Sequence, residues 1–289
     1  MTTSLKRTDE PRLAQLSSLL LPTLPAGTPF LLKSLTNENI DFVELAAIIE
    51  KFPSIAGKLI SLVNSAWSAP ATEVTSIEAT CSRLGLGVVK STSIALAIAA
   101  PFNPTQCPSF DPEYFWCSAL LTADAASRLV SIASSKNTLE PSTARAAGLL
   151  HNLGLLWLVD KLPAEVDQAL TMVKKNQHES LQQALFQVLG FDHAQAAGRL
   201  GSNWSLPQPL VEAMTHYPEM NYQGCQSEIV AIVGLAVRLV SAILKEEPCP
   251  EQDVRLSKLE IAEENLEGVF EQLNGQLVKT RAIAKVLIR

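Results

Sequence analysis

The stretch AAGLLHNLGLLWLV, residues 146–159, decides the fold because its apolar residues leave no polar face. A helical segment that is apolar all round lies in the interior of a protein. His151 and Asn152 interrupt this stretch together, and a buried imidazole and amide must either find hydrogen-bond partners or bind something. A single histidine in such a place is more often a satisfied core residue than a ligand, so the pair gains weight only from what surrounds it.

Helical periodicity extends outward from this stretch. Apolar residues recur at steps of three and four between Phe42 and Phe52, which is one stripe of an amphipathic helix. Asp41 stands immediately before the stripe and Glu44 three residues later, a capping-box pattern that predicts the start of the helix. Pro53 predicts its end, because proline cannot donate the next helical hydrogen bond.

Other helix boundaries carry the same kind of signal. Helix starts are predicted at Thr75 with Glu78, at Asp111 with Pro112, and at Asp192, after Gly190 closes the preceding helix. The second of these helices is expected to run to about Ala133, and Gly85 is a predicted C-terminal stop. No stretch alternates apolar and polar residues over six positions between turn residues, as a strand would. We therefore predict an all-α protein with a dozen or so short helices.

Length and composition limit the class of protein. At roughly 100–200 residues per domain, the 289 residues form one large domain or two packed ones. Apolar residues make up 47% and charged residues 18%, which excludes a mainly disordered chain. The net charge of −6 and the isoelectric point of about 5.3 provide no basic field, so nucleic acid is not expected as a partner. A local basic patch at Lys174 and Lys175 is a weaker alternative, because two adjacent lysines are more often a solvated helix face.

The cysteines and the apolar stretches indicate the compartment. The five cysteines, at positions 81, 107, 117, 225 and 249, form no CxxC pair and are typical of reduced cytosolic thiols. Residues 1–10 lack the order of a signal peptide. The longest apolar stretch, Ile229–Leu244, is shorter than about 18 residues and contains Arg238, so it predicts a buried helix rather than a membrane span. We expect a cytoplasmic protein with no membrane attachment.

Two proline-bearing seams divide the chain, at residues 101–112 and 246–253. An amphipathic stripe follows the second seam, formed by Leu256, Leu259, Leu266, Val269, Phe270 and Leu273. We expect this tail to pack back on the body, because exposed apolar stripes are rare on soluble monomers. A partner-binding helix is the alternative.

Three of the four histidines lie on helices with apolar faces. Besides His151, these are His193, which follows Asp192 at a helix start, and His216, which ends another helix just before Pro218. His178, in the sequence KKNQHES, is expected to be a solvated surface residue.

The segment GLLHNLGLL resembles the GLLHDIGxL segment of the HDOD family, a relative of the HD-superfamily metal phosphohydrolases. Further similar segments follow in the family's order: LPTLP at 21–25, ELAAIIEKFPSIAGKLISLVNSAW at 44–67, SIEATCSRLGLGVVKSTSIALAI at 76–98, FWCSAL at 115–120, GFDHAQAAGRLGSNWSLP at 190–207 and AMTHYP at 213–218. The resemblance covers residues 21–244. It implies an HDOD-type N-terminal helical subdomain over residues 1–105 and an HD-superfamily-like helical bundle over 106–246. The tail, residues 247–289, is expected to pack on the body.

The resemblance also implies which positions correspond to the metal ligands. An HD-type phosphohydrolase holds divalent metal with a histidine, an adjacent His-Asp pair and a distal aspartate. The first histidine is Cys117 here, the pair is His151 and Asn152, and the distal aspartate is best matched by Val237. A later histidine of the two-metal cyclic-dinucleotide enzymes is retained as His193, and their His-His pair is His216 and Tyr217.

The carboxylates of this ligand set are therefore missing. We expect neither a bound cofactor nor hydrolysis, because Mg²⁺ and Mn²⁺ prefer oxygen ligands and no carboxylate remains to bridge two metals. The resemblance then implies a non-catalytic bacterial signal-transduction module that binds a signalling protein or a small ligand, with a homodimer as a further option. The alternative is a metal-dependent phosphohydrolase acting on a nucleotide or cyclic dinucleotide. It would hold a divalent transition metal with Cys117, His151, His193 and His216, since Cys and His together are acceptable zinc ligands.

Two weaker motifs remain. Gly85-Leu86-Gly87 followed by Lys90-Ser91 is similar to a phosphate-binding loop, but the GxxxxGK[ST] spacing fails and no strand precedes it. We interpret it as a helix junction with close packing. Asn64 and Ser65 match an HDOD-like NSA motif, for which we favour a structural hydrogen bond.

Overall fold

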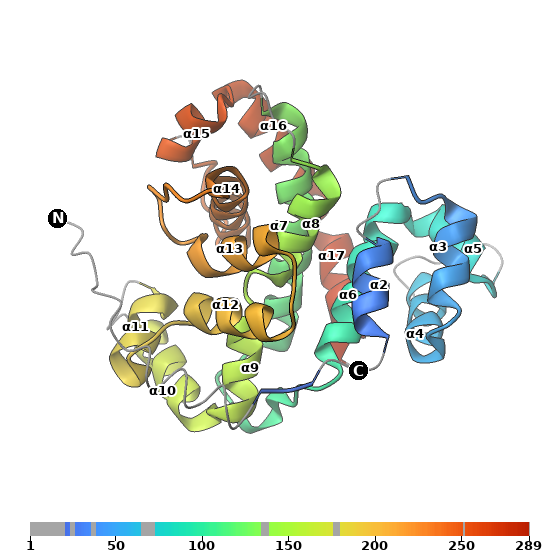
Figure 1. Cartoon of the computed structure of the whole chain (residues 1–289), viewed down its shortest axis with the longest axis horizontal. Coiled ribbons are helices and arrows are strands. Elements are labelled where there is room, and N and C mark those ends of the chain that lie inside the picture. The colour runs from blue at the N-terminus through green and yellow to red at the C-terminus, as the bar shows by residue number, and fades with distance from the viewer. Residues whose placement is uncertain are drawn as a thin grey trace.

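The computed structural model of the chain describes residues 21–23, 27–35, 39–64, 73–133, 139–175, 180–250 and 252–288. The regular structure in these residues is helical, as the apolar spacing predicts, and they contain no strand. The helices form a smaller N-terminal lobe and a larger body, with helix α17 (Leu277–Ile288) lying between them (Figure 1). His178 and Ser65 lie outside the described residues, so the expectations for them stay predictions.

The N-terminal lobe contains α2 (Thr28–Leu35), α3 (Phe42–Ile49), α4 (Pro53–Val63), α5 (Ile77–Leu84) and α6 (Leu86–Ala99). The predicted cap of α3 is confirmed, since the Asp41 carboxylate accepts a hydrogen bond from the Glu44 amide at 2.8 Å. The helix ends at Ile49, earlier than its apolar stripe predicts. Pro53 instead begins α4, because a residue in the first turn of a helix needs no N–H donor.

The junction of α5 and α6 is a sharp corner. Helix α5 is capped by Ser76, one residue after the predicted Thr75, and the Ser76 hydroxyl accepts from the Ala79 amide at 3.2 Å. Gly85 ends α5 as predicted and also precedes α6, with a φ of 89° that glycine adopts without strain. The two helices are bent by 117° at this point. The motif at residues 85–91 is therefore a helix junction.

The body follows a short helix, η1 (Pro104–Gln106). Its helices are α7 (Pro112–Ile132), α8 (Pro141–Leu150), α9 (Leu153–Lys161), α10 (Pro163–Lys174), α11 (Leu181–Leu189), α12 (His193–Asn203), α13 (Gln208–His216) and α14 (Ser227–Leu244). The predicted caps Asp111 and Asp192 both accept a hydrogen bond from an amide three residues later. Gly190 has the left-handed conformation that ends α11.

Helix α14 is the central helix of the body and packs against α7, α8 and α13. It is mostly apolar, with Arg238 as a charged residue in its interior turns, and within the described residues it is the single unbroken helix long and apolar enough for a membrane span. About two thirds of it, 67%, is buried inside the protein, which is typical of a core helix. The bent pair α5 and α6 passes the same test only if the two helices are counted together.

Three helices follow the second seam: α15 (Val254–Leu259), α16 (Glu263–Gly275) and α17. Helices α16 and α17 pack on α7, and α17 also contacts α4 and α6 of the N-terminal lobe. Leu266, Val269 and Leu273 of the tail stripe are buried and Phe270 is partly buried. The tail therefore covers the body and touches both lobes. The subdomain boundaries at 105 and 246 stay predictions.

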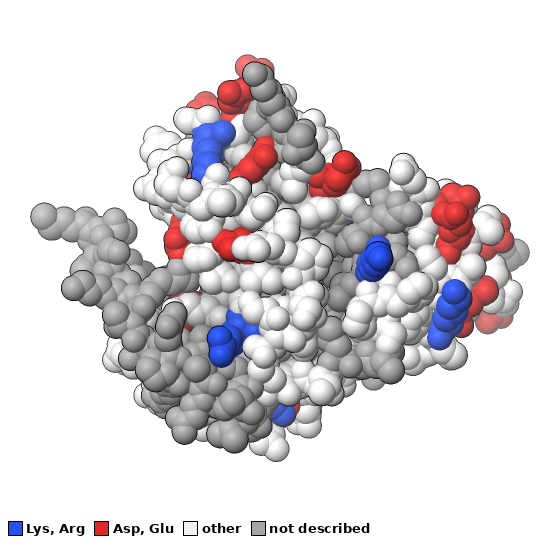
Figure 2. Space-filling view, in the orientation of Figure 1, with Lys and Arg blue, Asp and Glu red and all other residues white. Residues whose placement is uncertain are grey.

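Charged side chains are sparse on the face of the molecule drawn in Figure 2, where acidic groups gather over the tail and the N-terminal lobe. Lys174 and Lys175 are exposed, and the Lys174 ammonium donates to the backbone carbonyl of Ser109 at 3.2 Å. This arrangement is that of a solvated helix end.

Candidate functional site

The candidate site lies where the end of α8 meets the start of α12. Helix α8 can approach α7 closely because residue 148 is glycine: a Cβ there would lie 2.6 Å from the carbonyl oxygen of Thr122. The chain then turns at His151 and Asn152 and continues into α9. The apolar stretch quoted first is thus two short helices with the polar pair at their junction.

A second glycine brings α12 to the same place. A Cβ on Gly154 would overlap the carbonyl oxygen of His193 and the amide nitrogen of Ala197. Helices α9 and α12 therefore cross with their backbones in contact. This crossing sets His193, the first residue of α12, beside the His151 turn.

His151 is buried, with only 2% of its surface exposed. Its Nδ1 lies 2.6 Å from the carbonyl oxygen of Gly148. A carbonyl can only accept, so Nδ1 carries the proton and Nε2 is the bare nitrogen. Burial lowers the pKa of His151 to about 4, and the neighbouring His193 acts in the same direction, while the bond to Gly148 opposes it. The ring is therefore neutral near pH 7.

His193 is also buried, and its Nε2 forms a hydrogen bond with the Tyr217 hydroxyl at 2.8 Å. Its Nδ1 has no partner among the described residues. Burial lowers the pKa of His193, and the nearby Asp192 carboxylate opposes this effect. Asp192 is itself engaged, since it accepts from the Gln195 amide at 2.8 Å and from the Gln182 side chain at 2.7 Å.

Tyr217 contacts both imidazoles. Its ring stands edge-on to the His151 ring, with centroids 5.0 Å apart and planes at 89°, while its hydroxyl holds His193. Burial raises the pKa of Tyr217, so the phenol stays protonated. The three aromatic rings form one neutral, buried cluster, which we call the histidine centre: His151, His193 and Tyr217.

The C-terminal tail contacts the histidine centre at the backbone of Tyr217. Arg255 of α15 is buried, forms an ion pair with Asp253 at 2.8 Å, and donates to the carbonyl oxygen of Tyr217 at 3.4 Å. Gly234 of α14 leaves room for this contact, because a Cβ there would overlap the Arg255 guanidinium. The sequence offered no signal for this role of Arg255, beyond the capping position of Asp253.

Asn152, at the position of the family's aspartate, is partly buried and precedes α9 without capping it. Its Oδ1 is buried and has no hydrogen-bond partner among the described residues. This neutral amide brings no negative charge to the histidine centre.

His216 faces a different environment from its neighbour Tyr217. Its Nδ1 lies 2.9 Å from Glu219, its Nε2 lies 3.7 Å from Glu212, and its ring stacks on Tyr222 with centroids 4.5 Å apart. The side chain is 26% exposed. Glu212 and Glu219 therefore lie beside this partly exposed histidine rather than beside the buried pair.

Cys117 and Val237 complete the set of residues that the resemblance implies. Cys117 is buried on α7 and lines a surface hollow together with Arg281 of α17. Burial raises the pKa of its thiol to about 11, against the opposing effect of Arg281. Val237 is partly buried on α14 and packs on the apolar core. The described residues contain no group of three or more His, Cys, Asp or Glu side chains that could hold a metal.

The fold of this chain is similar to the folds of several solved structures. A protein of Marinobacter aquaeolei VT8 named for signal transduction is 23% identical, with a TM-score of 0.80 and 95% of this chain covered. This chain spans 61% of that protein. An HDOD domain protein with unknown function from Geobacter sulfurreducens is 19% identical, with a TM-score of 0.73 and coverage of 96% of this chain and 97% of that one.

A third solved structure, named as a phosphohydrolase of Shewanella amazonensis SB2B, is 21% identical, with a TM-score of 0.70 and coverage of 96% and 98% of the two chains. These likenesses show the shared all-helical fold. No curated protein matches the chain. The HDOD domain family matches residues 21–220, more than half of the sequence and including the whole histidine centre. The chain therefore belongs to the HDOD family.

Proposed function

We propose that this chain is a non-catalytic regulatory module of HDOD type, which acts by binding a partner protein or a small ligand. One observation carries the proposal: the Tyr217 hydroxyl holds His193 Nε2 at 2.8 Å, and the Tyr217 ring packs against His151. The Nε2 of His193 is thus used within the chain, while its Nδ1 has no partner among the described residues. This favours a centre that has become part of the core.

The donor set does not fit a hydrolytic divalent metal. His151 offers one bare nitrogen, Asn152 a neutral oxygen, and Asp192 a carboxylate already engaged in capping. Mg²⁺ and Mn²⁺ prefer oxygen ligands, and none of these described residues offers a free carboxylate to bridge two metals. We derive no metal-dependent step from these residues.

A zinc site of Cys and His is not favoured either. Cys117 lies with Arg281 of the tail helix, and His216 lies beside the carboxylates of Glu212 and Glu219. Two of the four ligands of the alternative, Cys117 and His216, thus have polar neighbours other than the histidine centre. The proposal of a binding module rests on these different surroundings of Cys117 and His216 together with the Tyr217 contact.

The partner class is part of the proposal. We propose a signalling protein, a small ligand or a second copy of the chain, with nucleic acid disfavoured by the net charge of −6. A relative of the same fold is named for signal transduction. The cysteines in the described residues are free thiols, which supports the cytoplasm as the proposed compartment.

The test is an assay for turnover and for metal. The purified chain is incubated with Mn²⁺ or Mg²⁺ and a panel of nucleotides and cyclic dinucleotides, and its metal content is measured after purification without chelator. We expect no turnover and far less than one metal per chain. Metal-dependent hydrolysis that His151→Ala abolishes would overturn the proposal in favour of the phosphohydrolase.

A further inference from the structure

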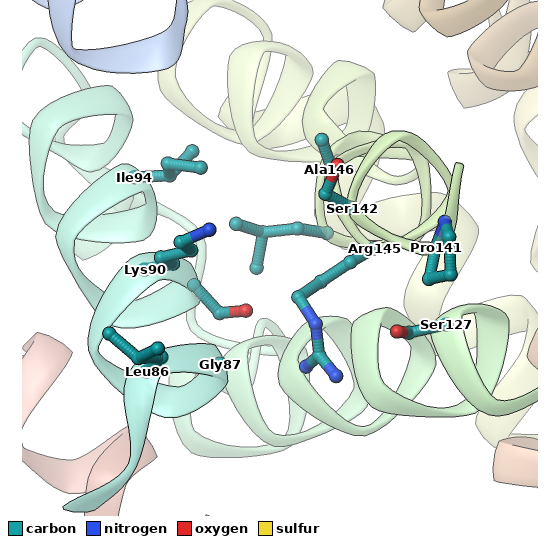
Figure 3. A pocket seen from close by; sticks show the side chains of 11 residues that line it. Leu86, Gly87, Lys90, Ile94, Ser127, Pro141, Ser142, Arg145 and Ala146 are labelled. Atoms are coloured by element: carbon teal, nitrogen blue, oxygen red, sulfur yellow. The ribbon is translucent and has the colours of Figure 1, made fainter. Parts of the chain in front are cut away.

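A cavity of about 210 Å³ lies between the two lobes, where α6 faces α7 and α8. Figure 3 shows Lys90 and Ile94 on α6 at one side and Ser142 and Arg145 on α8 at the other, with Ser127 of α7 beside them. None of the three residues of the histidine centre lines it. The cavity is a separate feature of the molecule.

The charged side chains that line the cavity are positive. Lys90 and Arg145 are its cations, and three serines add hydroxyl groups: Ser91, Ser127 and Ser142. No carboxylate occurs among the described residues that line it. Because the whole chain carries a net charge of −6, a lining with two cations and no acid favours an anionic occupant.

Ser91 supplies an independent sign of a missing ligand. It is 4% exposed, and its Oγ forms no hydrogen bond with the described residues. Ser93 on the same helix behaves differently, since its hydroxyl donates to the carbonyl oxygen of Val89 at 2.7 Å. A buried hydroxyl without a partner is costly, so its position at the cavity points to a group that it can bind.

Arg145 is held in place without being neutralised. Its guanidinium forms an ion pair with Asp124 at 2.9 Å, but Asp124 also pairs with Arg128 at 2.7 Å. One carboxylate is therefore shared by two guanidinium groups, which leaves a positive excess. Gly87 permits the close approach of Arg145 to α6, because a Cβ there would lie 3.3 Å from the guanidinium carbon.

Two helix starts also face the cavity. Leu86 and Gly87 open α6, and Pro141 and Ser142 open α8. Neither helix has a side-chain hydrogen bond at its N-cap. The first amides of a helix carry partial positive charge and bind anions, so both starts add to the field of Lys90 and Arg145.

We propose that this cavity binds the phosphate group of a small molecule. The ammonium of Lys90, the guanidinium of Arg145 and the hydroxyl of Ser91 contact the phosphate oxygens, and the α6 start contributes its amides. The volume of about 210 Å³ accommodates a phosphate with a small part of what it is attached to. The proposal goes beyond the proposed function, because it concerns a different site and holds whether or not the histidine centre is catalytic.

The experiment measures binding to the full chain by titration calorimetry with two probes, inorganic phosphate and AMP. We expect saturable binding of at least one probe at one site per chain. Lys90→Met and Ser91→Ala should each weaken it, Lys90→Met by about tenfold or more, since it removes a charged hydrogen-bond donor. Ser93→Ala is the matched control and should bind as the original chain does. Circular dichroism checks that each variant is folded.

The two probes separate the sources of the phosphate. Equal affinity for phosphate and AMP assigns recognition to the phosphate alone, and tighter binding of AMP indicates a nucleotide-like ligand. The proposal is overturned if neither probe binds the folded chain, or if both bind Lys90→Met and Ser91→Ala as tightly as the original. The turnover assay at the histidine centre is scored separately, so failure of one proposal is distinct from failure of the other.

Discussion

Helix α8 connects two polar regions of opposite character. At its C-terminal end the histidine centre is neutral, because burial lowers the pKa of both imidazoles. His151 Nδ1, His193 Nε2 and the Tyr217 hydroxyl are hydrogen-bonded within the chain, whereas His193 Nδ1 has no partner among the described residues. At its N-terminal end the cavity has cations on its lining and a buried hydroxyl without a partner. The difference teaches that one buried helix can carry a neutral aromatic cluster at one end and a cationic cavity at the other.

The comparison predicts opposite signs for polar truncations in the ligand-free protein. Removing a polar group that is satisfied at the histidine centre should lower the free energy of unfolding. Removing one that is unsatisfied at the cavity should raise it.

The largest effect is expected for Gly154→Ala. The new methyl group would overlap backbone atoms of His193 and Ala197, and backbone cannot move aside as a side chain can. We expect a loss of about 3 kcal/mol or more in the free energy of unfolding, measured by urea denaturation. Gly268→Ala is the matched control: it lies inside α16 with no atom near its Cβ, so it should stabilise by about 0.5–1 kcal/mol. Equal effects of the two would mean that α9 and α12 do not touch at Gly154.

The second effect is a loss of stability at mildly acidic pH. The pKa of His151 is lowered to about 4 in the folded protein, below its ordinary value near 6.5, so the unfolded chain binds the proton more readily. Stability from this residue is constant above the unfolded pKa, falls as the pH drops through 6.5, and levels off near the folded pKa. From about pH 7.5 to about pH 5.5 the free energy of unfolding should fall by about 1.4 kcal/mol for one histidine.

His151→Asn isolates this contribution, because its amide can replace the Nδ1–H donor without titrating. The difference in unfolding free energy between the two proteins should change with pH across this window, in favour of the variant at lower pH. A flat difference would contradict a buried, neutral His151. The lowered pKa of His193 also makes the free energy of unfolding fall with decreasing pH, and it does so in both proteins.

Local signals in the sequence predicted much of the fold. The caps Asp111 and Asp192 are predictable from sequence, because a capping side chain bonds to an amide only three residues away. Ser76 was missed in favour of Thr75, since two adjacent hydroxyl residues carry the same signal. The predicted all-α class is confirmed, because the 3.6-residue period persists through the described helices.

The sequence predicted only part of the histidine centre. The motif located His151 and His193, but nothing local indicated that the Tyr217 hydroxyl bonds to a ring 24 residues away. That contact depends on how α12 packs on α13 and on the approach of Arg255 from the tail. Cys117 illustrates the same gap, since the resemblance to the family groups it with the histidines while the structure sets it beside Arg281.

Tyr217→Phe should have a moderate effect. It leaves the ring contact with His151 but removes the hydroxyl, so His193 Nε2 is buried without a partner. We expect a loss of about 1–2 kcal/mol in unfolding free energy. The surface phenol variant Tyr114→Phe is the control, because that side chain is 47% exposed and should change stability little. An unchanged free energy of unfolding in Tyr217→Phe would mean that His193 finds another partner. That result would weaken the case for a centre absorbed into the core.

The smallest effect has the opposite sign and therefore decides the comparison. Ser91→Ala removes a buried hydroxyl that has no partner among the described residues and replaces serine with a better helix former. We expect the ligand-free protein to gain up to about 1 kcal/mol in unfolding free energy, measured beside Tyr217→Phe under the same conditions. A gain in stability together with weaker phosphate binding identifies a hydroxyl kept for a ligand at a cost to the fold. A loss of stability would show that Ser91 is satisfied in solution, and the two ends of α8 would then not differ in the way described.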